Sequence, residues 1–132
     1  MLSTIKSIAL QGLEGYLIEV QVDASNGMPY WEIVGLPDIS VKEAKERVKT
    51  AIKNSGIEFP NKKILINLAP ANIRKEGSSF DLAIACGILI AIGAIPQIDI
   101  NKLANTIFIG ELSLDGKVNR INGVLPICIE AK

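Results

Sequence analysis

The chain has 132 residues, of which 48% are apolar and 21% are charged, and its formal net charge is zero. This composition excludes disordered, collagen-like and disulfide-scaffold proteins, and the length fits one domain, 1–132, with a core of its own. The balanced charge predicts neither a general nucleic-acid-binding protein nor a membrane-surface protein. The longest apolar run, Leu82 to Ile95, is too short to cross a bilayer. We therefore expect a cytoplasmic protein without a membrane partner.

The amino-terminal third predicts three strands. Apolar and polar residues alternate from Thr4 to Val22 around a turn at Gln11–Gly15, which is typical of a β-hairpin with one buried face. The short run Tyr30–Val34 predicts a third strand, and the Gly-Leu-Pro-Asp sequence at 35–38 ends it.

A helix is predicted next. Ser40 and Glu43 have the spacing of a capping box, apolar residues then recur at helical spacing to about Asn54, and Gly56 lies just past the end. The opposite face of this helix is either a solvated surface with short-range ion pairs or a contact for an acidic partner. Its charged residues are Lys42, Glu43, Lys45, Glu46, Arg47, Lys49 and Lys53.

The second half predicts a buried strand and a buried helix. Lys62–Ala69 is a compact apolar strand closed by Pro70, and Ser79–Ile92 is a helix that is apolar almost all round, as expected for a central helix. Its two glycines are explained by close packing or a helix end.

The carboxyl-terminal part predicts smaller elements. A short helical piece at Asn101–Ala104 precedes a hairpin made of Thr106–Ser113 and Lys117–Ile121. The apolar pattern of Val124–Lys132 is helix-like but stops without a cap, so we expect the chain to be part of a longer protein.

The segment from Asn67 to Leu82 carries the candidate chemistry. A strand leads into a charged loop, and hydroxyl residues stand at the start of the buried helix. The loop is either an ordinary helix cap or a site where helix amides face a reacting group, with Ser79 as nucleophile. The chain contains no histidine, so a Ser-His-Asp triad is excluded. The candidate residues are Arg74, Lys75, Glu76, Gly77, Ser78, Ser79 and Asp81.

Two motifs resemble Lon-type proteases. Lys75-Glu76-Gly77-Ser78-Ser79 is similar to their Lys-Asp-Gly-Pro-Ser loop, with Ser79 at the position of the nucleophile, and residues 108–118 are similar to their Thr-Gly-Glu hairpin. The resemblance is closer to the amino-terminal domain of the magnesium-chelatase-like AAA+ ATPases, the ComM/YifB group. The motifs at 35–43, 67–82 and 110–116 occur in the family's order, and the resemblance covers essentially the whole chain.

The resemblance implies a Lon-protease-like α+β fold, also seen in the second domain of a small-subunit ribosomal protein, with a mostly antiparallel sheet and two main helices. The catalytic lysine of Lon corresponds here to Leu125, which cannot accept a proton, so the resemblance implies a vestigial Ser79 and no catalytic residue. No phosphate-loop sequence and no metal-ligand cluster is present, so we expect no cofactor or metal in this domain.

ATP and magnesium are then expected only in a downstream module. The implied role is that of an accessory domain, which assembles, regulates or positions an ATPase ring in DNA processing, with competence as one setting. Its implied partners are its own ATPase module, the ring neighbours and DNA.

Two alternatives stay open. The chain could be a serine peptidase that uses Ser79, with Lys75 as the nearby candidate base. It could also be a DNA-binding module that contacts phosphates through Lys62, Lys63, Arg74 and Lys75. The aromatic residues do not interleave with these basic residues in the sequence, so base stacking is not supported at this level.

Overall fold

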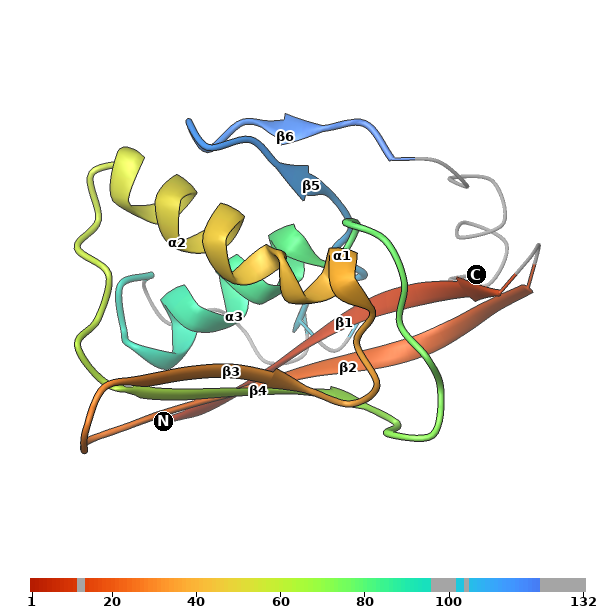
Figure 1. The fold of residues 1–132 in the computed structure, drawn as a ribbon, viewed down its shortest axis with the longest axis horizontal. Coiled ribbons are helices and arrows are strands. Elements are labelled where there is room, and N and C mark those ends of the chain that lie inside the picture. Colours follow the sequence, from red (N-terminus) through yellow and green to blue (C-terminus); the bar gives the residue numbers. More distant parts are fainter. Residues whose placement is uncertain (12–13, 96–101, 104, 122–132) are drawn as a thin grey trace.

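A four-stranded sheet forms one layer of the protein, in the order β1-β2-β4-β3 (Figure 1). The computed structural model describes residues 1–132 except 12–13, 96–101, 104 and 122–132. The strands are β1 (Leu2–Gln11), β2 (Glu14–Ser25), β3 (Tyr30–Val34) and β4 (Lys63–Ala69). Neighbouring strands are antiparallel except β3 and β4, which run parallel. The predicted hairpin, third strand and fourth strand are confirmed.

The two faces of the sheet have different surroundings. Alternate residues of each strand point to one face, where the helices cover them (Figure 1). The other face leaves apolar side chains such as Leu17 and Leu65 exposed. The largest completely buried apolar side chains are Ile5, Ile8, Ile18, Val20, Val22, Ile64, Ile66, Leu68, Phe80, Ile84 and Ile88.

The connection between β3 and β4 is helical, as parallel strands require. It consists of α1 (Ile39–Lys42) and α2 (Ala44–Asn54), which meet at Glu43. The prediction of a capping box at Ser40 is wrong, because Asp38 is the cap: its Oδ1 accepts a hydrogen bond of 2.7 Å from the backbone N–H of Val41. The N–H of Glu43, which a capping box at Ser40 would use, instead donates to the carbonyl of Ile39 at 2.9 Å.

The central helix is α3 (Asp81–Ala91), which packs on β1, β2 and α2. It begins two residues later than predicted, so Ser79 lies in the preceding turn and not at the helix cap. Close packing explains Gly87, because a Cβ there would lie 2.6 Å from Cγ2 of Val22. The hydroxyl of Ser3 also donates a hydrogen bond of 2.7 Å to the carbonyl of Gly87.

The carboxyl-terminal hairpin is confirmed with shorter strands, β5 (Glu111–Leu112) and β6 (Val118–Asn119), which are antiparallel. Lys102 and Leu103 are helical, whereas positions 101 and 104 of the predicted helical piece lie outside the described residues. The helix predicted at Val124–Lys132 also lies outside them.

The architecture is therefore α+β, with a mostly antiparallel four-stranded sheet and two helices, α2 and α3, packed on one face. In the part of the chain that the structure describes, no helix is long and apolar enough to cross a membrane.

Candidate functional site

The Gly-Leu-Pro-Asp turn holds the candidate loop against the end of the sheet. Gly35 has φ +105° and Leu36 has φ +55°, and a Cβ on Gly35 would lie 2.3 Å from the carbonyl oxygen of Leu68. Only glycine permits this approach at this backbone angle. The turn brings the chain beside Lys75, whose N–H donates to the carbonyl of Leu36 at 3.0 Å and whose carbonyl accepts from the N–H of Asp38 at 2.9 Å.

Lys75 is completely buried, although it comes from a charged loop. Its ammonium group donates a hydrogen bond to the carbonyl of Pro70. Burial lowers the pKa of Lys75 below its ordinary value, because the charged form loses its hydration. The structure thus places the Lys75 ammonium inside the protein, where phosphate groups of a nucleic acid do not reach it.

Asp81 is also completely buried, and it joins three elements. Arg47 of α2 donates to both carboxylate oxygens of Asp81, from Nε at 2.7 Å and from Nη2 at 3.0 Å. The N–H of Leu112 in β5 donates to Oδ2 at 3.0 Å. The hydrogen bonds with Asp81 raise the pKa of Arg47. Burial raises the pKa of Asp81, and the hydrogen bonds from Arg47 and from the N–H of Leu112 oppose that rise.

Arg47 therefore does not lie on the solvated helix face where the sequence placed it. Its side chain is 18% exposed and its Nη2 also donates to the carbonyl of Ser40 at 2.9 Å. The Arg47–Asp81 pair connects α2, α3 and β5, so its role in the described structure is to hold these elements together.

Ser79 lines a small hollow of about 260 Å³ between its own loop, β1 and the carboxyl-terminal hairpin. The hollow brings two acidic residues, Glu76 and Glu111, near Arg120. Among the hydrogen bonds of the described residues, none involves the Ser79 hydroxyl, and no lysine of the described ranges contributes to the lining. The lining residues are Ile8, Leu10, Glu76, Gly77, Ser78, Ser79, Glu111, Arg120 and Ile121.

Gly110 fixes the backbone around Ser79. Its N–H donates to the carbonyl of Ser79 at 2.9 Å and its carbonyl accepts from the N–H of Leu82 at 3.1 Å. A Cβ on Gly110 would lie 2.7 Å from Cγ1 of Val118, so the hairpin packs closely on this turn. The two motifs that resemble Lon proteases are thereby in contact with each other.

The predicted nucleic-acid contacts do not form one patch. Lys62 and Lys63 lie at the start of β4, whereas Arg74 and Lys75 follow its end. The strand separates the two pairs by roughly 20 Å at about 3.3 Å per residue. Arg74 is exposed and forms an ion pair of 3.4 Å with Glu76, and Lys75 is buried.

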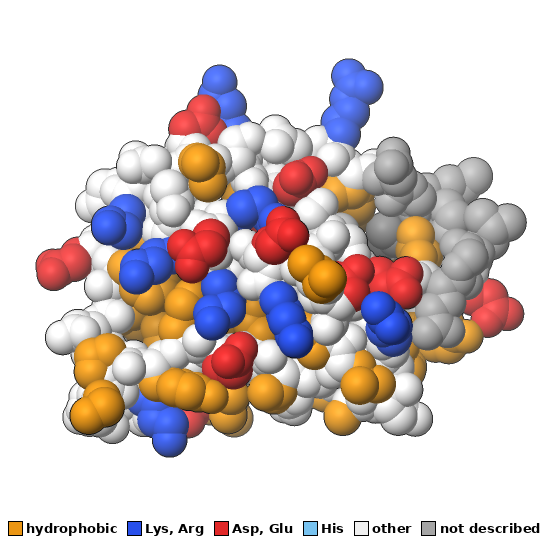
Figure 2. Space-filling model, viewed as in Figure 1, with side chains coloured by type: hydrophobic (Ala, Val, Ile, Leu, Met, Phe, Trp, Pro, Cys, Tyr) orange, Lys and Arg blue, Asp and Glu red, His pale blue; other side chains and the backbone are white. Residues whose placement is uncertain are grey.

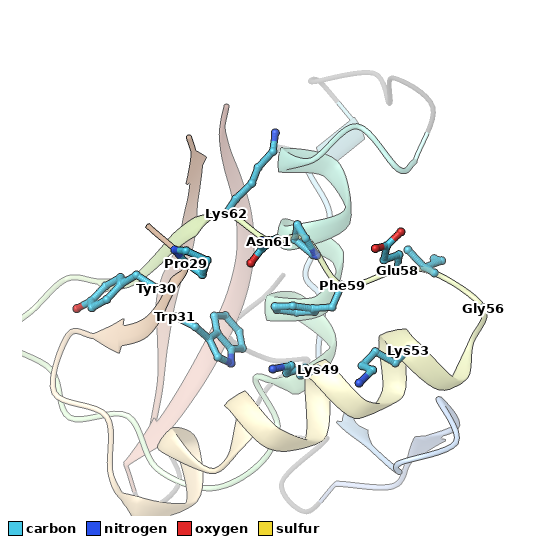
Figure 3. A pocket seen from close by; sticks show the side chains of 12 residues that line it. Pro29, Tyr30, Trp31, Lys49, Lys53, Gly56, Glu58, Phe59, Asn61 and Lys62 are labelled. Carbon is cyan, nitrogen blue, oxygen red and sulfur yellow. The ribbon is translucent and has the colours of Figure 1, made fainter. Parts of the chain in front are cut away.

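The structure instead gathers basic and aromatic residues at the start of β3. An open hollow of about 720 Å³ lies between β3, α2 and the loop that precedes β4 (Figure 3). Lys62 is the single predicted contact among its lining residues; the others were missed because they come from separate segments. They include Tyr30, Trp31, Lys49, Lys53 and Phe59.

Surface charge is mixed around this hollow. Lysine, arginine and acidic side chains are interspersed over the α1 and α2 layer, and hydrophobic side chains gather below them toward β3 and β4 (Figure 2). In the described residues, no group of three or more potential ligands could hold a metal ion.

Residues 20–132 match the family model described as subunit ChlI of Mg-chelatase. The chain belongs to this ChlI family. It is 44% identical over 130 residues to the protein YifB of Escherichia coli, which covers 98% of this chain and 25% of YifB. It is 41% identical over 131 residues to the competence protein ComM of Haemophilus influenzae, which covers 99% of this chain and 25% of ComM. The chain thus spans about a quarter of the length of these relatives.

A more distant similarity connects this ChlI-family domain with Lon. The chain is 34% identical over 134 residues to Lon protease 2 of Bacillus subtilis, which covers 89% of this chain and 23% of that protein. The chain therefore corresponds to the amino-terminal ChlI-like domain of the ComM/YifB proteins, which are Mg-chelatase-like AAA+ proteins and distantly Lon-like. The resemblance inferred from the sequence motifs is confirmed. Leu125, the position of the missing lysine, lies outside the described residues.

Proposed function

We propose that this ChlI-family domain is a non-catalytic accessory domain that assembles or regulates a ring-forming AAA+ ATPase. Its partners are its own ATPase module, which holds ATP and magnesium, and the neighbouring subunits of the ring. The observation that carries the proposal is the state of Ser79. A nucleophilic serine needs a base within hydrogen-bond reach, and the described structure provides no such contact.

The charged residues near Ser79 support the same conclusion. The ammonium group of Lys75, the candidate base, is directed to the carbonyl of Pro70, and Asp81 is occupied by Arg47 and Leu112. The side chains of Lys75 and Asp81 therefore stabilise the fold around the loop. What remains at the surface around Ser79 is a shallow polar hollow with exposed Glu76 and Arg120, which suits a contact between proteins.

The setting of the proposed role is DNA processing. It rests on the name of the relative from Haemophilus influenzae, a competence protein, to which 99% of this chain aligns. The serine peptidase alternative would require Ser79 to be activated by a group outside the described residues.

Deletion of residues 1–132 from the full-length protein tests the accessory role. We expect the remaining protein to bind ATP with unchanged affinity and to show altered oligomer formation and ATP hydrolysis, as measured by analytical ultracentrifugation and phosphate release. Ser79→Ala in the full-length protein tests for a catalytic contribution and should leave ATP binding and ATP hydrolysis unchanged. Loss of ATP binding after the deletion, or unchanged assembly and hydrolysis, would contradict the proposal.

A further inference from the structure

The open hollow at the start of β3, which we call the aromatic–lysine pocket, has the volume of a ligand site. It is lined by residues of β3, α2 and residues 56–62, and its volume of about 720 Å³ lies within the range of roughly 300–1,000 Å³ that small-molecule pockets occupy. It lies at the other end of β4 from the Ser79 hollow. The two sites are therefore separate.

Aromatic rings form the wall of the pocket. The rings of Trp31 and Phe59 meet edge to face, with centroids 5.6 Å apart and an interplanar angle of 62° (Figure 3). Tyr30 is 47% exposed and points outward at the rim (Figure 3). Because the two rings are not coplanar, a planar ligand would stack on the face of one ring at a time.

Lysine side chains surround this wall. Lys49 and Lys53 lie one turn apart on α2, and Lys62 lies at the opposite rim. The ammonium group of Lys49 is 5.5 Å from the centroid of the Phe59 ring. None of these three lysines forms an ion pair with any described residue, and Glu58 is the acidic residue in the lining. The pocket therefore carries positive charge that attracts an anion.

A buried donor also lacks a partner here. The Nε1 atom of Trp31 is buried and forms no hydrogen bond among the described residues. A buried donor left without a partner is unfavourable in proteins. Because this atom is closed off from solvent, it offers no contact of its own to a ligand in the pocket.

We propose that the aromatic–lysine pocket binds a nucleotide unit, with the base on the Trp31–Phe59 wall and the phosphate on the Lys49 and Lys53 ammonium groups. Stacking on aromatic rings accepts any base, and lysine recognises phosphate as a point charge. An acidic peptide could use the lysines but would leave the aromatic rings unused. The nucleotide unit could belong to a free nucleotide or to a single-stranded nucleic acid, because both carry a base and a phosphate. The inference does not depend on the accessory role.

The single tryptophan of the chain, Trp31, reports directly on the pocket. The 132-residue chain is titrated with ATP, with a twelve-nucleotide oligothymidine, with inorganic tripolyphosphate and with polyglutamate, while Trp31 emission is measured. We expect saturable quenching by ATP or by the oligonucleotide, and at least tenfold weaker binding of tripolyphosphate, because stacking contributes about 1–3 kcal/mol per base. Equal affinity for ATP and the oligonucleotide indicates a free-nucleotide site, whereas preference for the oligonucleotide indicates a single strand.

Variants distinguish the contribution of the lysines, which contact phosphate, from that of the aromatic rings, which stack on the base. Lys49→Ala with Lys53→Ala should weaken every phosphate-bearing probe about tenfold or more, whereas Lys42→Ala with Lys117→Ala, which removes the same charge outside the pocket, should weaken each probe less than threefold. Phe59→Leu should weaken ATP but leave tripolyphosphate unchanged. Since these lysines are exposed, the charge variants should fold, which far-ultraviolet circular dichroism checks.

Three results would overturn the proposal. The first is the absence of binding by both ATP and the oligonucleotide. The second is equal binding of ATP and tripolyphosphate, which shows attraction of charge alone. The third is polyglutamate binding as tightly as the nucleic-acid probes, which assigns the pocket to an acidic peptide.

Discussion

The two ends of β4 use charged residues in opposite ways. At its far end, Asp81, Arg47 and Lys75 are withdrawn from solvent and their polar atoms contact other protein groups. At its start, Lys49, Lys53 and Lys62 stay exposed beside aromatic rings and form no ion pair with described residues. Charged residues of the first kind maintain the fold, and those of the second kind are available to a ligand. The motif that resembles a protease site belongs to the first kind.

The largest expected effect comes from Asp81→Ala. Removing one partner of a buried ion pair leaves the other uncompensated, and here also leaves the N–H of Leu112 without its acceptor. We expect the free energy of unfolding to fall by about 3–5 kcal/mol, measured by urea denaturation.

Glu76→Ala is the matched control, because Glu76 pairs with Arg74 at the surface. Exposed pairs contribute about 0.2–1 kcal/mol, so this variant should be close to the parent. Similar losses in the two variants would show that the Asp81–Arg47 pair has no special structural role.

Gly35→Ala should have the next largest effect. The added Cβ would meet the carbonyl oxygen of Leu68 at 2.3 Å, on a backbone at φ +105°. We expect a loss of about 2–4 kcal/mol from strain and overpacking together. Gly56→Ala is the control, since it shares a positive φ of +87° but has no atom within 4 Å of the added Cβ. If both variants lose the same amount, the close approach to Leu68 contributes nothing.

The burial of Lys75 should make the free energy of unfolding depend on pH. Its pKa in the folded protein is lowered by burial from an ordinary value of 10.5, so the unfolded chain binds the proton more tightly. The resulting destabilisation is present below the folded pKa and disappears as pH rises toward 10.5, so this residue makes stability increase with pH in that window.

Urea denaturation of the parent and of Lys75→Met at several alkaline pH values measures this contribution. The unfolding free energy of the parent relative to the variant should rise with pH, by at most about 1.4 kcal/mol per pH unit. A flat difference for Lys75→Met would mean that its ammonium is hydrated in the folded protein.

The smallest expected effect is that of Lys53→Ala on stability. Lys53 is exposed and pairs with no described residue, so its removal should change the unfolding free energy by less than about 0.5 kcal/mol. A loss comparable to that of Asp81→Ala would place Lys53 among the residues that maintain the fold and would remove the contrast between the two ends of β4.

Local patterns predicted most of the fold, and long-range contacts account for what they missed. Alternation located the hairpin and β4, because one face of each strand is buried. The charge of Arg47 suggested a solvated helix face. Its pairing with Asp81 was missed because the two residues are 34 positions apart in the sequence. The sequence also predicted that Lys75 could contact phosphates, whereas the structure buries it. Its burial depends on the Gly35–Leu36 turn, which is distant in the sequence.

The candidate site was predicted in part. The motifs identified the Ser79 loop and the carboxyl-terminal hairpin, but only the structure shows that the two meet at Gly110. The aromatic–lysine pocket escaped prediction because Trp31, Lys49 and Phe59 come from a strand, a helix and a loop, so the sequence never shows them side by side.

Reaction of Ser79 with a fluorophosphonate probe tests most directly whether this domain is non-catalytic. The parent protein and Ser79→Ala, both full length, are treated with the probe at neutral pH, and labelling is quantified by intact-protein mass spectrometry. The account predicts equal background labelling in the two proteins, because no base contacts the Ser79 hydroxyl in the described structure. Stoichiometric labelling of the parent that is lost in Ser79→Ala would contradict it and would establish Ser79 as an active nucleophile.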